Sequence, residues 1–250
     1  EKGKFVHLAD YIEREGNGPS PLLKNVAQIW NLYEKKKAKE NSLDFDDLLL
    51  KAAKLLKDNP EIRKIYQERW EYVHIDEYQD TNEVQYLMSK LLSENNKNIC
   101  VVGDADQNIY SWRGANLKNI LSFEKDYPNA KIVLLEENYR STKNILEAAN
   151  VIIKKNKYRP DKNLFTKNET GEKIGFYEAL EENDEAEFVA TKILQLWDNK
   201  TVLPSEIAVL YRANFQSRAL EEAMLRYNIP YQVLGVKFFE RKEIKDTLAY

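Results

Sequence analysis

Three short apolar runs constrain the fold of this chain more than any other feature. They span residues 72–75, 99–102 and 132–135 and lack the polar alternation of a half-exposed strand, which is typical of parallel strands covered on both faces. Between the first two runs, Asp80 and Glu83 have the spacing of a capping box. An apolar stripe at helical spacing follows at Val84, Leu87, Met88, Leu91 and Leu92. This order predicts a βαβ unit, and so an α/β fold with a parallel sheet.

The segments on either side of these runs predict further helices and a second α/β unit. Residues 1–70 read as helical, with a loop at 16–21, and the Lys-rich run at 34–40 reads as a solvated helix face. A helix is expected from about Ser141, followed by a polar connection at 154–171. The second unit is expected to contain strands at 174–177, 207–211 and 231–234, and helices at 184–197 and 217–227.

Charge and composition exclude several classes of protein. The 250 residues include 38 Lys and Arg against 41 Asp and Glu, a formal net charge of -3, so the chain is no polycation. Any contact with nucleic acid must come from local placement of charge. With 43% hydrophobic and 11% aromatic residues, the chain has enough apolar surface for a core, which excludes wholesale disorder.

The cysteines, histidines and chain ends give weaker indications. Cys100 is the single cysteine, so no internal disulfide or CxxC metal site is possible, and a cytoplasmic location is expected. His7 and His74 are too few for a zinc site, and His74 is expected to pack. No apolar run approaches about 18 residues, so no membrane partner is expected. Glu1 and Tyr250 both interrupt what looks like ordered sequence, and we expect a piece of a longer protein.

Two adjacent carboxylates, Asp76 and Glu77, directly follow the first apolar run. Ligands of α/β folds bind at the carboxyl ends of the strands. One carboxylate of such a pair can hold hydrated Mg²⁺ while the other polarises a water molecule that attacks a phosphate. Acids are common at strand ends, so the dipeptide alone has an equally simple structural explanation.

The second run leads into residues suited to phosphate and to nucleic acid. Gln107 follows a turn at Gly103, and a Gln there can contact a γ-phosphate and orient its attacking water. Tyr110, Trp112 and Arg113 come next, two aromatic rings and a guanidinium that suit single-stranded nucleic acid. The alternative is that the two rings fill a core.

The third run leads into Tyr139 and Arg140. An aromatic ring and an Arg at a strand-to-helix junction can stack on a base and reach a phosphoryl group. The alternative is packing for Tyr139 and a surface ion pair for Arg140.

Together these segments resemble motifs II, III and IV of superfamily 1 DNA helicases of the UvrD/Rep/PcrA type. The resemblance lies in residues 75–82, 102–114 and 138–142, and residues 43–48 and 239–246 resemble two further segments of that family. It runs from about Ser42 to Tyr250. It implies parts of two RecA-like P-loop NTPase domains with parallel sheets, plus an N-terminal helical segment. The implied divisions are residues 1–41, the end of an inserted helical subdomain, 42–135, the later part of the first motor domain, and 136–250, the first part of the second.

The resemblance also implies roles in binding and hydrolysing ATP. Asp76 would be the Mg²⁺ ligand, Glu77 would activate the hydrolytic water, and Gln107 would contact the γ-phosphate. Tyr139 would stack on adenine, and Arg140 would be an arginine finger supplied across the cleft between the two motor domains.

On the DNA side, the resemblance implies that Tyr110 and Trp112 meet single-stranded DNA, with Trp112 stacking on a base. Arg113 would link the strand to the nucleotide site. The implied activity is ATP-dependent 3′-to-5′ translocation and unwinding at single/double-strand junctions, in repair or replication.

The family's phosphate-binding loop, GxxxxGK[ST], finds no match among the eight glycines of this sequence. We therefore expect the 250 residues alone to hydrolyse nothing and at most to bind single strands. A third reading is part of a helicase–nuclease subunit, which a nuclease segment further along the protein would identify.

Overall fold

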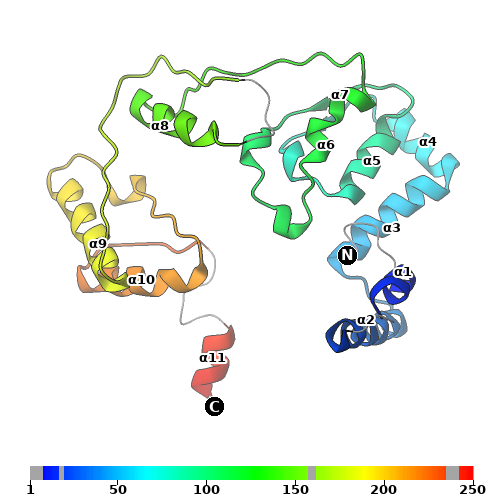
Figure 1. Ribbon diagram of the computed structural model, residues 1–250, viewed down its shortest axis with the longest axis horizontal. Coiled ribbons are helices and arrows are strands. Elements are labelled where there is room, and N and C mark those ends of the chain that lie inside the picture. The colour runs from blue at the N-terminus through cyan, green and yellow to red at the C-terminus, as the bar shows by residue number, and fades with distance from the viewer. Residues whose placement is uncertain (1–7, 17–19, 157–161, 235–241, 250) are drawn as a thin grey trace. The chain divides into compact units, whose positions relative to one another are not determined.

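The computed structural model describes residues 8–16, 20–156, 162–234 and 242–249 (Figure 1). Residues 17–19 of the predicted loop, 157–161 of the predicted polar connection and 239–241 of the last family-like segment lie outside the described residues. The chain forms two compact units, one up to Glu172 and one from Lys173, and each is described here by itself.

The first unit is mainly helical, as its N-terminal sequence predicts. Its helices are α1 (Leu8–Tyr11), α2 (Pro21–Lys39), α3 (Phe45–Asp58), α4 (Pro60–Arg69), α5 (Glu83–Ser93), α6 (Lys118–Leu121), α7 (Phe123–Asp126) and α8 (Lys143–Ile153), with a π turn at Ile12–Gly16. Among the helices that the structure describes in either unit, none is long and apolar enough to cross a membrane.

The Lys-rich run of α2 is not a solvated face throughout. Lys37 is 9% exposed, and its Nζ atom lies 2.9 Å from Glu34 Oε2 and 3.1 Å from Asp44 Oδ2. Its third carboxylate partner is Asp47, in the first turn of α3. The expectation of a solvated face is therefore wrong at Lys37, because the capped N-terminus of α3 brings acids over this part of α2.

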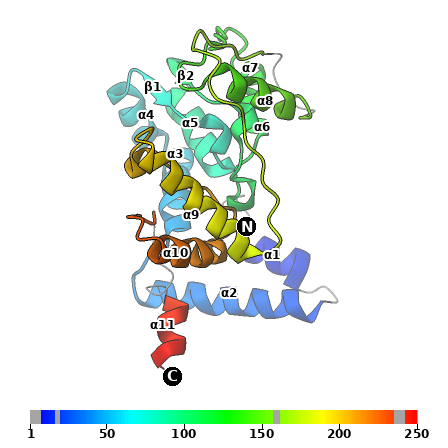
Figure 2. The same cartoon turned by 90° about the vertical axis from the view of Figure 1, so that its left-hand side faces the viewer.

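Two parallel strands, β1 (Val73–Ile75) and β2 (Ile99–Val101), form the sheet, and α5 connects them, as predicted (Figure 2). His74 pairs with Cys100 in the register, and both side chains are exposed. The expectations that the sheet is covered on both faces and that His74 packs are therefore wrong for the described structure.

The crossover helix begins two residues later than the sequence suggests. Tyr78–Asp80 forms a 3-10 turn, and the capping box of α5 consists of Asn82 and Gln85. The Gln85 N–H donates to Asn82 Oδ1 over 2.9 Å, and the Asn82 N–H donates to Gln85 Oε1 over 2.9 Å. The cap predicted at Asp80 and Glu83 is wrong because the 3-10 turn occupies its first residue.

The strand predicted at 132–135 is absent, and those residues are exposed coil. A β-strand needs a neighbour for its backbone hydrogen bonds. Beyond β1 and β2, the pairing recorded among the described residues is one parallel bridge, from Glu137 to Phe165. The helix predicted after this segment is present as α8, with Thr142 as its N-cap.

The second unit contains α9 (Glu182–Asp198), α10 (Ser217–Arg226) and α11 (Lys242–Ala249). Its core lies between α9 and α10, which pack on each other (Figure 1), and consists of Ala186, Ala190, Ile193, Ala223, Met224 and Ile229. The two predicted helices are confirmed. The strands predicted at 174–177, 207–211 and 231–234 are not formed, and Phe176, Leu210 and Leu234 are each at least 90% exposed.

Candidate nucleotide site and nucleic-acid interface

The two carboxylates after β1 stand at an exposed, tightly turned strand end. Glu77 has φ 51° and ψ 41°, the left-handed conformation that non-glycine residues seldom adopt. Asp76 Oδ1 accepts the Glu77 backbone N–H over 2.9 Å, which supports the turn. Both side chains are exposed, so both are open to a ligand.

Gln79 joins this strand end to the loop after β2. Its Nε2 atom donates to Glu77 Oε2 over 2.7 Å, and its Oε1 atom accepts the Asp104 backbone N–H over 3.0 Å. Asp104 Oδ2 in turn accepts from Nε2 of Gln107 over 2.9 Å. A continuous chain of hydrogen bonds therefore connects Glu77 to Gln107, two residues that the sequence analysis singled out from different strands.

Lys162 is a charged neighbour of this site that sequence reasoning missed. It follows α8 in the chain, and its ammonium group pairs with Asp104 and lies 3.7 Å from Asp106 Oδ2. Burial works to raise the pKa of Asp104, but hydrogen bonds from Lys162 and Gln107 outweigh it and hold that pKa below its usual range. In the sequence, Lys162 is one Lys within a polar connection, and no pattern distinguishes it from the others.

The segment after Gln107 exposes its aromatic rings. Trp112 is 67% exposed and Tyr110 is 39% exposed, so the alternative that they fill a core is wrong. The Arg113 guanidinium carbon lies 4.6 Å from the Trp112 ring centroid and 5.4 Å from that of Tyr110. The two rings and the cation form one exposed surface with the chemistry that stacks on bases and attracts phosphate.

Tyr139 and Arg140 are exposed as well, and Tyr139 donates its hydroxyl to Glu137 Oε2 over 3.1 Å. That hydrogen bond raises the pKa of Tyr139, and the ammonium of Lys167 holds the pKa of Glu137 below its usual range. Within the described part of the chain Arg140 forms no ion pair, and no hydrogen bond joins it to Glu77 or Gln107. The structure thus brings Asp76, Glu77 and Gln107 together but not Tyr139 and Arg140 with them.

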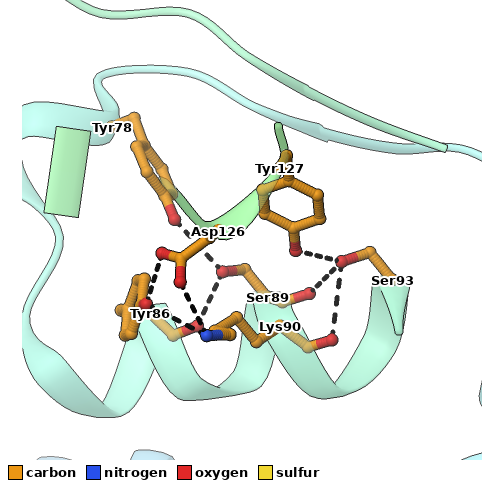
Figure 3. Close-up of polar contacts among 7 residues, drawn as sticks. All are labelled: Tyr78, Tyr86, Ser89, Lys90, Ser93, Asp126 and Tyr127. Atoms are coloured by element: carbon orange, nitrogen blue, oxygen red, sulfur yellow. Dashed lines mark hydrogen bonds and ion pairs between the residues drawn. The ribbon is translucent and has the colours of Figure 1, made fainter. Parts of the chain in front are cut away.

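A polar network connects α7 and the residue after it to α5 (Figure 3). Asp126 accepts from the Tyr86 hydroxyl over 2.5 Å and from the Lys90 ammonium over 2.9 Å. Farther along α5, Ser93 Oγ lies 2.7 Å from the Tyr127 hydroxyl. The network therefore holds the chain after Trp112, which includes α7, against α5, the helix that follows Asp80.

The strand end offers oxygen atoms that fit Mg²⁺. Asp76 and Glu77 carry exposed carboxylates, and Asp80 Oδ1 is buried with no hydrogen-bond partner among the described residues. Burial, and then the charge of Glu77, raise the pKa of Asp80. Mg²⁺ prefers one or two carboxylates and retains water as its other ligands, which this arrangement permits. Among the described residues, the carboxylates that converge closely enough to share an ion are those of Glu34, Asp44 and Asp47, and they already hold the ammonium of Lys37.

Comparison with known proteins finds two family matches, which together cover most of the chain. Residues 7–128 match the UvrD/REP helicase N-terminal domain, and residues 133–250 match the UvrD-like helicase C-terminal domain. The ATP-dependent DNA helicase PcrA of Bacillus subtilis is 53% identical over 226 residues, 90% of this chain and 31% of the relative. PcrA of Leuconostoc citreum is 47% identical over 250 residues, 100% of this chain and 33% of the relative. The chain therefore spans about a third of the length of the curated relatives it matches.

Proposed function

Since the chain belongs to the UvrD/REP family of superfamily 1 helicases, we propose that the full-length protein couples ATP hydrolysis to 3′-to-5′ movement along single-stranded DNA and to duplex unwinding. One observation carries this proposal. The exposed carboxylate of Glu77 is connected by hydrogen bonds to Gln107, and the exposed rings of Tyr110 and Trp112 follow Gln107 directly in the same segment. The groups proposed to act on phosphate are thereby hydrogen-bonded to the segment that carries the rings proposed to contact bases.

In binding and hydrolysing ATP, the exposed carboxylates of Asp76 and Glu77 support different roles for the two residues. Asp76 would hold Mg²⁺, which would neutralise charge on the ATP phosphates when bound. Glu77 accepts a proton from the attacking water, and the Gln107 amide contacts the γ-phosphate. Tyr139 stacks on adenine and Arg140 reaches the phosphates as an arginine finger, in keeping with their exposure and with the absence of an ion pair at Arg140 among the described residues.

On the DNA side, Trp112 stacks on a base, Tyr110 lies beside it, and Arg113 connects the bound strand to the nucleotide site. Base–aromatic stacking is tolerant of sequence because every base has a π face. A near-neutral protein with a few exposed rings can therefore hold a moving strand without reading its sequence. The substrates are single strands and single/double-strand junctions, in DNA repair or replication in the cytoplasm.

We assign the chain to the three structural divisions that the motifs indicate. Residues 1–41 belong to an inserted helical subdomain, 42–135 to the first RecA-like motor domain and 136–250 to the second. In this arrangement Glu77 and Gln107 belong to one motor domain, while Tyr139 and Arg140 belong to the other. Hydrolysis would open and close the cleft between the domains, so that the rings alternately grip and release bases.

The test compares ATP turnover by the full-length protein with and without single-stranded DNA. We expect DNA to stimulate turnover, because the base-contacting rings and Gln107 belong to one segment. Turnover that DNA leaves unchanged would contradict the coupling.

A second function is favoured for the 250 residues taken by themselves, namely binding of single-stranded DNA without turnover. Its support is the exposed surface of Tyr110, Trp112 and Arg113, in a sequence with no GxxxxGK[ST] match. A fluorescence titration with oligonucleotides at low and at moderate salt tests it, since contacts to phosphate weaken as salt rises. Binding in neither condition would contradict it.

A further inference from the structure

We propose that Gln79 is a positioning residue for ATP hydrolysis, which holds the Glu77 carboxylate in register with the loop that carries Gln107. This inference rests on the function proposed above and adds to it a residue that touches neither phosphate nor DNA. It starts from the burial of Gln79, which is 1% exposed although its neighbours Asp76 and Glu77 are exposed.

The partners of Gln79 leave one orientation for its amide. The carboxylate of Glu77 only accepts hydrogen bonds, and the backbone N–H of Asp104 only donates. The Nε2 atom therefore faces Glu77, at 2.7 Å, and the Oε1 atom faces Asp104, at 3.0 Å. An amide fits both partners, whereas a carboxylate at position 79 fits only Asp104.

Packing holds the amide in place. A Cβ atom on Gly103 would lie 2.5 Å from Gln79 Oε1, so the loop after β2 approaches this side chain as closely as a glycine allows. The Asn108 side-chain amide donates to the backbone carbonyl of Gln79, from the far side of the same loop. Tyr78, the preceding residue, is 0% exposed, and its N–H donates to Val102 O over 3.0 Å. A buried polar side chain with both ends paired is a stiff connection.

The connection determines which oxygen of Glu77 is available for chemistry. Gln79 donates a hydrogen bond to Oε2 of Glu77, and among the described residues Oε1 of Glu77 has no hydrogen-bond partner. A carboxylate held at one oxygen presents the other in a fixed position, as a general base requires. Because Asp104 also accepts from Gln107, a shift of the DNA-contacting segment is transmitted through Gln79 to Glu77.

Two substitutions separate this role from plain support of the loop. Gln79→Met removes both hydrogen bonds. Gln79→Glu keeps the acceptor for Asp104 but places a carboxylate against Glu77. The matched control is Gln67→Met, because Gln67 is also buried, at 7% exposure, and also bridges two partners, with Nε2 2.6 Å from Leu91 O and Oε1 2.6 Å from Asn95 Nδ2.

The experiment measures DNA-stimulated kcat and the KM for ATP in the full-length protein, with thermal unfolding of each variant. We expect both Gln79 variants to lose about 10- to 100-fold in kcat. Their KM stays within about twofold, since ground-state binding does not use Glu77. Gln67→Met keeps the wild-type kcat. A folding defect alone would lower the kcat of Gln67→Met and of Gln79→Met alike.

The outcomes separate this inference from the function on which it rests. A wild-type protein without DNA-stimulated hydrolysis overturns both. An active wild type with an equally active Gln79→Glu variant overturns the positioning role alone, because the loop contact is then all that matters. If Gln79→Met unfolds, Gln79→Glu, which keeps the size and the acceptor, decides the question.

Discussion

Gly103 and Gln79 lie so close together that a Cβ atom on Gly103 would stand 2.5 Å from the Oε1 atom of Gln79. The two residues belong to different strand ends of one parallel sheet, and their approach brings the loop of Gln107 next to Glu77. The spacing of the candidate catalytic groups thus depends on the absence of a side chain at position 103.

Gly103→Ala is the first test of that dependence. The added methyl group must displace the buried Gln79 amide, because Ile120 Cδ1 and Tyr78 N also lie within 3.1 Å of the new Cβ. We expect a loss of about 1–3 kcal/mol in unfolding free energy, measured by chemical denaturation, and a fall in DNA-stimulated turnover. Gly175→Ala is the control, since a Cβ there meets nothing within 4 Å. Equal behaviour of the two variants would contradict the account.

Trp112→Ala tests the proposed nucleic-acid surface. The indole is 67% exposed and its removal takes away a stacking platform, so we expect the dissociation constant for single-stranded oligonucleotides to rise about 5- to 150-fold. Fluorescence anisotropy at fixed salt measures it. Trp70→Ala removes another exposed indole, 43% exposed and placed after α4, and should leave binding unchanged. A matching loss in both variants would argue against a specific surface.

Variants of Tyr139 separate stacking from hydrogen bonding at the proposed adenine site. Tyr139→Phe loses the 3.1 Å hydrogen bond to Glu137 but keeps the ring, whereas Tyr139→Ala loses both. If the ring stacks on adenine, only the Ala variant weakens ATP binding, by about 2- to 12-fold. Equilibrium binding of a fluorescent ATP analogue to the full-length protein distinguishes them. A Phe variant as weak as the Ala variant would show that the hydroxyl is the important group.

Asp126 gives a prediction for the pH dependence of stability. Burial works to raise its pKa, but hydrogen bonds from Lys90 and Tyr86 outweigh it and lower that pKa in the folded state. The stabilisation is therefore present above the unfolded pKa, about 3.9, and is lost as the pH falls through the lower folded value. Asp126→Asn should be less stable than the wild type at neutral pH, with a difference that shrinks below about pH 4.

Tyr86→Phe is the matched variant for this network, because it removes the two hydrogen bonds of the Tyr86 hydroxyl, one donated to Asp126 and one accepted from Lys90, and keeps the ion pair between Lys90 and Asp126. Its deficit at neutral pH should be the smaller of the two. Chemical denaturation of each protein between neutral pH and about pH 3 makes the comparison. A difference between the wild type and Asp126→Asn that stays constant over this range would exclude a pH-dependent contribution from Asp126.

Local patterns predicted the elements whose partners are close in sequence. The runs at 72–75 and 99–102 became β1 and β2 because α5, with its own apolar stripe, returns the chain beside the first strand. The run at 132–135 has similar composition but meets no neighbouring strand in the described structure, and it remains coil. Strand propensity is a property of a segment, whereas strand formation is a property of a pair.

The candidate site was predictable in its residue types and less so in its connections. Asp76, Glu77 and Gln107 are recognisable because acids and amides after apolar strands indicate a ligand edge. Gln79 follows the same apolar run, but nothing in the sequence marks it as buried, since a Gln in a polar stretch is ordinarily exposed. Lys37 was missed for the corresponding reason. Its burial depends on Asp44 and Asp47, which reach it only after the chain has turned into α3.

The most direct measurement is ATP turnover by a Glu77→Gln variant of the full-length protein. Glu77 is proposed as the group that takes the proton from the attacking water, and a neutral amide cannot take it. We expect DNA-stimulated hydrolysis to be abolished while ATP is still bound, and Glu71→Gln, which changes an exposed acid just before β1, to behave as the wild type. Retained turnover in Glu77→Gln would contradict the role of Glu77 and with it the account of the site.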